Sequence, residues 1–95
     1  GGVLVELMRD VEVALAPVSR EAAEAMLRRL RIWPLLQGFR DQPRRDVEAV
    51  VDALVQVGNL AAALGDRLVE LDVNPLIVGA EGKGAIAADA RAVLA

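Results

Sequence analysis

Residues 70–91 read ELDVNPLIVGAEGKGAIAADAR, and this stretch decides how the chain folds. Aliphatic runs stand on both sides of the glycine-rich segment Gly79–Gly84, a pattern that predicts a β-hairpin. In an extended first arm, Glu70, Asp72 and Asn74 would share one face and the aliphatic residues between them would share the other. The hairpin is therefore expected to present a row of oxygen donors over an aliphatic reverse side.

A turn centred on residues 81–82 would fix the register of the two arms. Asn74 is then opposite Asp89, and Asp72 is opposite Arg91. Directly opposed side chains have Cβ atoms ~4.5–5.5 Å apart, so the amide oxygen and the carboxylate would be close enough to share one small cation. Oxygen donors without His or Cys suit a hard ion such as Mg²⁺, which keeps waters and takes further oxygens from substrate phosphates.

Plainer interpretations of the same residues stay open. An acid-rich strand face is most often only solvated, and Asp72 opposite Arg91 also fits a cross-strand ion pair. Pro75 has no N–H to donate to a ladder, so the strand is expected to bulge or break directly after Asn74.

The composition excludes several classes of protein. The chain has 95 residues, of which 55% are hydrophobic and 26% charged, enough for one folded domain or a piece of one. It carries 11 basic and 14 acidic residues, and Trp33 and Phe39 are its only aromatic residues, which argues against a nucleic-acid partner. Cys and His are absent, so thiolate chemistry and histidine-based catalysis are excluded. No apolar run approaches the ~20 residues that cross a bilayer, so we expect no membrane partner and a cytoplasmic location.

The N-terminal half predicts two strands and a helix. Residues 3–8 and 11–16 are aliphatic runs separated by a polar pair, which predicts a first β-hairpin. Ser19 is a suitable N-cap for a helix over residues 20–30. Residues 32–45 contain two prolines and a glycine and are expected to form a long loop.

A second helix follows this loop. Aliphatic residues recur every three or four positions from Val47 to Leu64, Asp46 is its expected cap and Gly65 its expected end. Gly58 within it costs roughly 1 kcal/mol against Ala and indicates a close contact between the helix and the sheet. The order of elements predicts an α+β fold, an antiparallel sheet of two hairpins with two helices on one face.

Three parts of the chain resemble a known family. They are Gly1–Leu7, Leu35–Arg40 and Glu70–Leu76, the last followed by Asp89–Arg91. They are similar to the C-terminal part of the ATP-grasp domain in NDP-forming acyl-CoA synthetases, which include the ADP-forming acetate-CoA ligases and are related to the β subunit of succinyl-CoA synthetase. The resemblance spans essentially the whole chain. It implies that residues 1–95 form one segment, the C-terminal half of an ATP-grasp fold, with the N-terminal nucleotide-binding half absent.

The resemblance also implies site residues and cofactors. Asn74 and Asp89 are the implied Mg²⁺ ligands, the same pair that the assumed register brings together. Asp72 is implied to be a catalytic residue near a phosphohistidine that a partner domain delivers. Arg40 is the implied cofactor contact, although Asp41 stands where the family commonly has Gly. The implied cofactors are Mg²⁺ and ATP or ADP.

In that family, acyl-CoA, ADP and phosphate are converted to carboxylic acid, CoA and ATP through acyl phosphate and phosphohistidine. The resemblance implies that the chain is part of such a ligase, completed by the rest of the ATP-grasp domain and by CoA-binding and phosphohistidine domains, and inactive as a separate segment. Two alternatives stay open: a regulatory synthetase-like domain of a protein acetyltransferase, and a non-catalytic interaction module.

Overall fold

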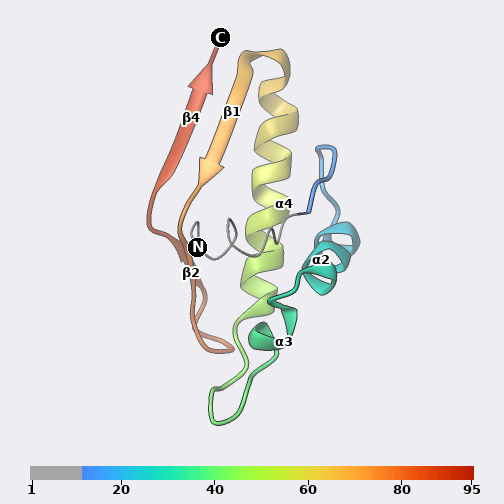
Figure 1. Cartoon of the computed structure of the whole chain (residues 1–95). Coiled ribbons are helices and arrows are strands. Elements are labelled where there is room, and N and C mark those ends of the chain that lie inside the picture. The colour runs from blue at the N-terminus through green and yellow to red at the C-terminus, as the bar shows by residue number, and fades with distance from the viewer. Residues whose placement is uncertain (1–11) are drawn as a thin grey trace.

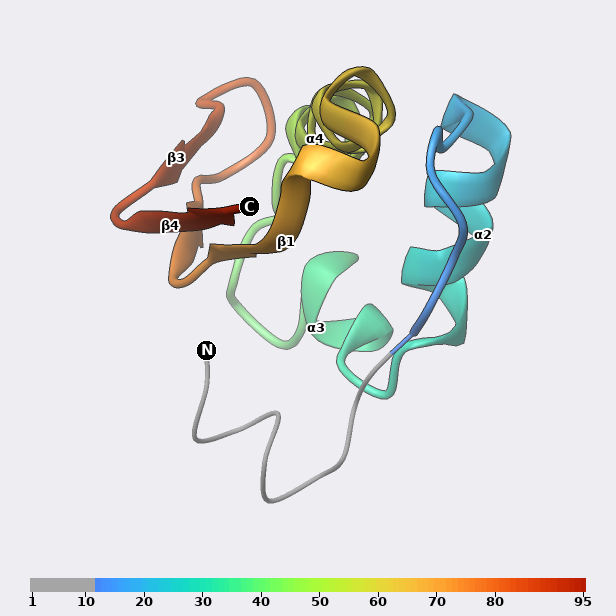
Figure 2. The same ribbon diagram turned by 90° about the horizontal axis from the view of Figure 1, so that it is seen from above.

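The computed structural model describes residues 12–95 as a row of helices followed by antiparallel strands. The elements are α2 (Arg20–Arg29), α3 (Trp33–Leu36), α4 (Val47–Leu64), the 3₁₀ turn η1 (Gly65–Arg67), β1 (Leu68–Val73), β2 (Leu76–Val78), β3 (Ala85–Ala87) and β4 (Ala90–Leu94). The strands lie on one side of α4 and α2 lies on the other (Figures 1 and 2). The α+β class is therefore confirmed, with both long helices on the same side of the strands.

The first predicted hairpin is not borne out where it can be judged. Its first strand, residues 3–8, lies outside the described residues, and residues 12–16 of its second strand form no strand. Val13 and Leu15 are instead 86% and 92% exposed. Alternation shows which side chains a strand would bury, but a strand also needs a neighbour for its backbone groups, and no described strand pairs with this segment.

Both predicted helices are confirmed with their caps. The Ser19 hydroxyl accepts a hydrogen bond from the Ala22 N–H at 3.0 Å, and the Asp46 carboxylate accepts one from Ala49 at 3.1 Å. Each cap satisfies a backbone donor that the helix leaves unpaired. The loop between them contains a short helix, α3, that the sequence did not predict. Pro34 lies in its first turn, where a missing N–H costs no helical hydrogen bond.

The hydrophobic core of the described residues lies between the two long helices. It consists of Ala23 and Leu27 from α2 and Val47, Val50 and Val51 from α4. Partly buried side chains of α3 and β2 pack around it. The core therefore joins both long helices to the β2 end of the strands.

Gly58 marks a close contact, but not the one expected. A Cβ atom at Gly58 would lie 2.8 Å from the backbone nitrogen of Val18. Val18 belongs to the segment that leads into α2, so the close approach is between α4 and this segment and not between α4 and the sheet. The expectation of a helix-sheet contact at this position was wrong. A glycine within a helix indicates that another segment packs closely against it, but the sequence does not show which segment that is.

The length and composition of α4 bear on the expectation that no segment crosses a membrane. The continuous helical stretch Val47–Arg67 has 21 residues and a mean hydropathy of 1.5, which by length and composition would suffice to cross a membrane. Only 22% of an apolar 18-residue window within that stretch is buried among the described residues. Core helices of soluble proteins pass the same test, so one such helix is weak evidence for a membrane span.

The strands form one long antiparallel hairpin that is divided into two ladders. β1 pairs with β4, and β2 pairs with β3. Asp72 is opposite Arg91 and Leu76 is opposite Ala87, as the assumed register requires. The assumed register is therefore confirmed for both ladders, except at the start of β1, where it shifts between Leu68 and Glu70.

The turn of this hairpin also lies where it was expected. The Lys83 N–H donates to the Ala80 carbonyl at 2.8 Å, so residues 81–82 are the central residues of a β-turn. Gly82 has a φ of 84°, a conformation that glycine adopts without steric cost at the third position of such a turn. The turn chemistry therefore sets the register of both ladders.

Candidate functional site

Both arms of the hairpin leave the ladder at the same level, at Asn74-Pro75 on one arm and Ala88-Asp89 on the other. The Asn74 N–H donates to the Asp89 carbonyl at 3.1 Å, and the Ala88 N–H donates to the Pro75 carbonyl at 2.9 Å. The expected break at Asn74-Pro75 is therefore confirmed. Because both arms interrupt the ladder together, the pairing is the same on both sides of the break and Asn74 lies beside Asp89.

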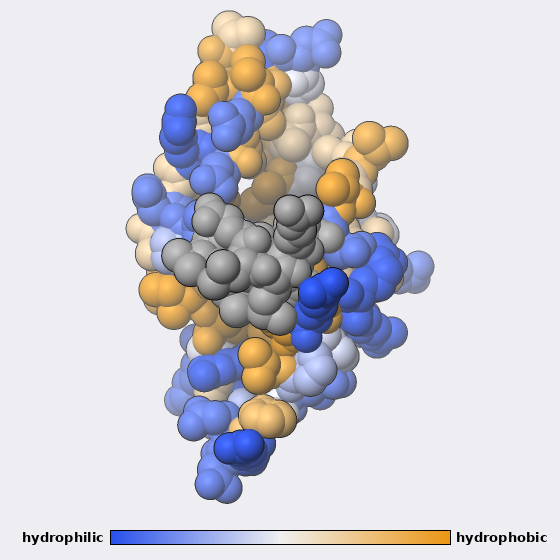
Figure 3. All heavy atoms as spheres, in the orientation of Figure 1, coloured by the Kyte–Doolittle hydropathy of each residue, from blue (hydrophilic) through white to orange (hydrophobic). Residues whose placement is uncertain are grey.

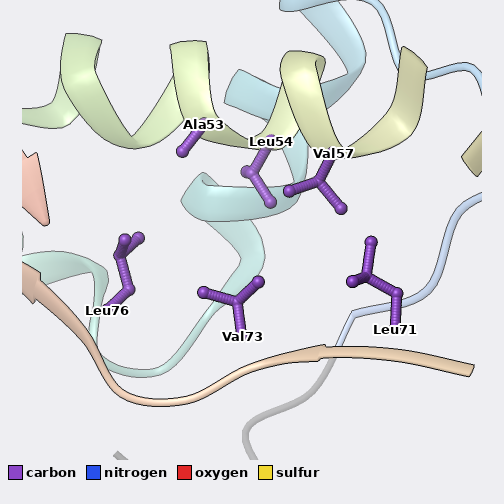
Figure 4. A pocket seen from close by; sticks show the side chains of 6 residues that line it. All are labelled: Ala53, Leu54, Val57, Leu71, Val73 and Leu76. Atoms are coloured by element: carbon purple, nitrogen blue, oxygen red, sulfur yellow. The ribbon is translucent and has the colours of Figure 1, made fainter. Parts of the chain in front are cut away.

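The two faces of β1 carry different chemistry. Leu71 and Val73 point toward α4 (Figure 4), whereas Asp72 is exposed, as the alternation predicts. Val69 departs from the expected pattern and is 65% exposed. The pairing of β1 with β4 is irregular at this position, and such an irregularity changes the direction of a side chain.

The chemistry of Asn74 and Asp89 fits a hard divalent cation. Both residues are exposed, and one carboxylate oxygen of Asp89 accepts a hydrogen bond from the Ala90 N–H at 2.9 Å. The other carboxylate oxygen has no hydrogen-bond partner within residues 12–95. No group of three or more acidic, His or Cys side chains suitable for a metal occurs in the described part of the chain. This pair would therefore leave most positions around an ion to water or bound anions, as Mg²⁺ usually does.

Asp72 and Arg91 are opposite each other but do not form an ion pair. Their Cα atoms are partners in the β1–β4 ladder, and both side chains are exposed. The ion pairs found among residues 12–95 involve other residues. The interpretation of these two residues as a plain cross-strand ion pair is thus not supported, and Asp72 has no charged partner among the described residues.

Arg40 lies on a separate turn at the far end of the helical layer. Phe39 and Gln42 form an isolated β-bridge across this turn, and Arg40 itself has a φ of 57°. Its guanidinium carbon lies 5.2 Å from the centre of the Phe39 ring, a favourable cation–π distance. The structure gives Arg40 this contact and none with Asn74 or Asp89.

The loop at the tip of the hairpin is tied to the start of α4, a feature that the sequence did not predict. Residues 44–46 run alongside the loop: the Asp46 N–H donates to the Gly79 carbonyl at 2.9 Å and the Glu81 N–H donates to the Arg44 carbonyl at 2.8 Å. Arg44 and Glu81 also form an ion pair at 3.2 Å. The loop is therefore held by a third segment of backbone.

The Asp46 side chain adds a further bond to this arrangement. One carboxylate oxygen accepts from the Ala49 N–H at 3.1 Å, and the other accepts from the Gly84 N–H at 2.8 Å. The bond from Gly84 is the main cause that lowers the pKa of Asp46, followed by the bond from Ala49. The sequence identified the cap, but no local pattern indicates Gly84, because it lies 38 residues further along the chain.

An apolar pocket lies between α4 and the first arm of the hairpin (Figure 4). Its lining residues are Ala53, Leu54, Val57, Leu71, Val73 and Leu76. Apolar side chains also reach the surface where β1 begins and β4 ends (Figure 3), with Val69 and Leu94 65% and 55% exposed. The described residues thus leave an apolar surface beside α4 that they do not cover themselves.

The chain matches a known sequence family over nearly its whole length. The family model described as an ATP-grasp domain matches residues 1–94. The chain belongs to the ATP-grasp family.

Relatives of the chain include ADP-forming acetate-CoA ligases, which confirms the resemblance. The β subunit of ADP-forming acetate-CoA ligase II from Pyrococcus furiosus is 37% identical over 94 residues, which are 99% of this chain and 40% of that protein. An ADP-forming acetate-CoA ligase from Methanocaldococcus jannaschii is 38% identical over 93 residues, 98% of this chain and 13% of that protein. The chain therefore spans less than half the length of these relatives.

A solved structure shows the same fold. The dinucleotide-forming acetyl-coenzyme A synthetase 1 of Candidatus Korarchaeum cryptofilum, in complex with coenzyme A and Mg-AMPPCP, has a TM-score of 0.89 and 39% identity. The match covers 100% of this chain and 43% of that one. In that structure, the phosphohistidine segment points towards the nucleotide-binding site.

Proposed function

We propose that this chain is the C-terminal part of the ATP-grasp domain of an ADP-forming acid-CoA ligase, in which it supplies the protein ligands of the magnesium–nucleotide complex. The observation that carries this proposal is the backbone hydrogen bond that sets Asn74 beside Asp89 at the break of the hairpin. The identity to acetate-CoA ligases over nearly the whole chain supports it.

Asn74 and Asp89 would hold Mg²⁺ through the amide oxygen and the carboxylate oxygen that Ala90 leaves free. When bound, the ion would neutralise the charge that develops on phosphate oxygens during phosphoryl transfer. The role of the chain is to hold these two donors at a fixed separation, which the ladders on both sides of the break provide.

Asp72 and Arg40 take supporting roles in this proposal. Asp72 is exposed and has no charged partner within residues 12–95, so its carboxylate is available to the phosphohistidine segment of a partner domain. Arg40 is exposed and always cationic, which suits a contact with a nucleotide phosphate. The remaining half of the ATP-grasp domain and the CoA-binding and phosphohistidine domains would complete the enzyme. We place it in the cytoplasm, where its nucleotide and acyl-CoA substrates occur.

Neither alternative function is favoured by a specific observation. The relatives quoted above are named as ligases or synthetases, and none of these names describes an acetyltransferase or a scaffold. The exposed oxygen pair at the break supports a chemical role for the hairpin rather than a role as a surface for protein contacts alone.

The metal assignment is tested in the full-length protein that contains this chain. Nucleotide-dependent Mn²⁺ binding is measured by electron paramagnetic resonance for the wild type, Asn74→Ala and Asp89→Ala, with Asn59→Ala as a control on the exposed side of α4. We expect each of the first two variants to bind Mn²⁺ at least ~10-fold more weakly and the control to bind it normally. Unchanged affinity in both hairpin variants would show that the assignment is wrong.

A further inference from the structure

We propose that Asp46 is a positioning residue for the metal-binding hairpin, because it fixes the loop end of the β2–β3 ladder and thereby the spacing of Asn74 and Asp89 at the other end. The inference rests on the proposed function of that pair. It concerns a residue that neither contacts the ion nor lies next to its ligands in the sequence.

The β2–β3 ladder needs support from outside itself. Each strand has only 3 residues, and a two-stranded ladder is marginally stable in water. Its outward-facing cross-strand pair, Ile77 and Ile86, is 58% and 70% exposed, so this face adds little burial. The geometry of the ladder therefore depends on what holds its two ends.

Asp46 holds the loop end through both arms. Its N–H donates to the Gly79 carbonyl at 2.9 Å, and its carboxylate accepts from the Gly84 N–H at 2.8 Å. The Gly79 N–H in turn donates to the Gly84 carbonyl at 2.9 Å. These bonds, which we call the clamp, close the hairpin where β2 ends and β3 begins. The next residue, Val47, is only 5% exposed and belongs to the core, so the clamp is anchored to a rigid element.

The clamp is close enough to the two proposed metal ligands, Asn74 and Asp89, to set their geometry. One strand of 3 residues separates Gly79 from the break on the first arm, and one of equal length separates Gly84 from it on the second. This distance is about 10 Å of extended chain. If the loop end frays, the pairing can slip, and a slip of one residue turns side chains to the opposite face. The amide of Asn74 and the carboxylate of Asp89 would then no longer share one ion.

A helix cap alone does not require this arrangement. Capping of α4 uses one carboxylate oxygen, the acceptor for Ala49, whereas the clamp uses the other. Asparagine is nearly isosteric and keeps an oxygen for the cap, but its NH₂ group cannot accept a bond from Gly84. Asp46→Asn therefore removes the side-chain bond of the clamp, the one from Gly84, and leaves the cap and the backbone bond to Gly79. Asp46→Ser does the same with a shorter side chain and serves as a second variant.

The experiment uses the full-length protein and compares Asp46→Asn with two matched controls. Ser19→Ala removes the cap of α2 and leaves the hairpin untouched. Glu81→Gln removes one negative charge from the hairpin loop and breaks only an exposed ion pair. Mn²⁺ affinity in the presence of nucleotide is measured as above. We expect Asp46→Asn to weaken Mn²⁺ binding ~10-fold, as loss of a residue that supports metal ligands typically does, and both controls to leave it unchanged.

Hydrogen–deuterium exchange without metal gives a second readout. The Asn74 and Ala88 N–H groups donate across the break, so their exchange reports whether the hairpin holds its geometry there. We expect faster exchange at both positions in Asp46→Asn and in Asp46→Ser, and wild-type exchange in Ser19→Ala. A role as a cap alone would predict wild-type exchange at Asn74 and Ala88 in both Asp46 variants, because both variants keep the cap.

The outcomes separate this inference from the proposed function. Normal Mn²⁺ binding by Asp46→Asn, in a protein whose Asn74→Ala variant binds Mn²⁺ weakly, would overturn the positioning role and leave the metal assignment in place. Normal Mn²⁺ binding by Asn74→Ala and Asp89→Ala would instead defeat the metal assignment. Unchanged exchange at Asn74 and Ala88 in the Asp46 variants would overturn the clamp whatever the metal result.

Discussion

The carboxylate of Asp46 accepts a hydrogen bond from the Gly84 N–H at 2.8 Å and joins the start of α4 to the hairpin loop. The same carboxylate caps α4 through Ala49. Both donors are backbone N–H groups, so the bonds are strongest when the carboxylate is ionised. The stability of the start of α4 and that of the hairpin loop therefore both depend on the ionisation of the Asp46 carboxyl group.

This link predicts a specific pH dependence. The pKa of Asp46 is lowered in the folded chain by the bonds from Gly84 and Ala49. A lowered folded-state pKa contributes stability that is present above the unfolded value of ~3.9 and is lost as the pH falls through the folded value. We expect the urea midpoint of the 95-residue chain to drop in this acidic window and the drop to be smaller in Asp46→Asn. Identical pH profiles for the two proteins would contradict the link.

Gly58→Ala tests the close approach of α4 to the segment before α2. Helix propensity alone favours Ala by roughly 1 kcal/mol. The new Cβ would, however, lie 2.8 Å from the Val18 nitrogen, a backbone atom that cannot rotate away. Overpacking of this kind typically costs about 1–3 kcal/mol, so we expect the free energy of unfolding to fall. It is measured by urea denaturation, with Asn59→Ala, an exposed neighbour on α4, as the control. A stabilised Gly58→Ala chain would show that the contact is loose.

The buried core predicts a contrast between two positions on α4. Val51 is 2% exposed and Leu60 is 48% exposed. Val51→Ala removes two buried methyl groups and leaves a cavity, which we expect to lower the free energy of unfolding by about 2 kcal/mol. Leu60→Ala removes a larger side chain but should cost less, because half of that side chain already contacts water. Equal losses in the two variants would mean that the face of α4 bearing Leu60 is also packed.

Local signals predicted much of this fold because they act within a few residues. Ser19 and Asp46 bond to N–H groups three positions later, and Gly82 supplies the positive φ of the turn. This turn fixes the register, so a turn assumed at residues 81–82 is enough to predict that Asn74 lies beside Asp89. Asn74 and Asp89 are distant in sequence, but the hairpin turn between them is enough to place them side by side.

The features that were missed depend on contacts between distant segments. The partner of Gly58 is Val18, and the partner of Gly84 is Asp46; in neither case does a repeating pattern link the two positions. The interrupted pairing beside Val69 likewise turns this side chain away from the face that alternation assigns to it. Alternation describes the preferred environment of a side chain, and the neighbours that provide that environment are set by tertiary structure.

The ion pairs between α2 and α4 give a final prediction, in which the expected effect is small. Arg20, the first residue of α2, bonds to both Glu48 and Asp52 of α4, and all three side chains are at least half exposed. The hydrogen bond from Arg20 to Asp52 is the main cause that raises the pKa of Arg20, but a solvated pair contributes little to stability. We expect Arg20→Gln to lower the free energy of unfolding only slightly, and less still at high salt, where exposed charges are screened. Arg28→Gln, which breaks a pair within α2 only, is the control for loss of charge. A loss in Arg20→Gln that is several times larger and does not depend on salt would show that these pairs orient the two helices.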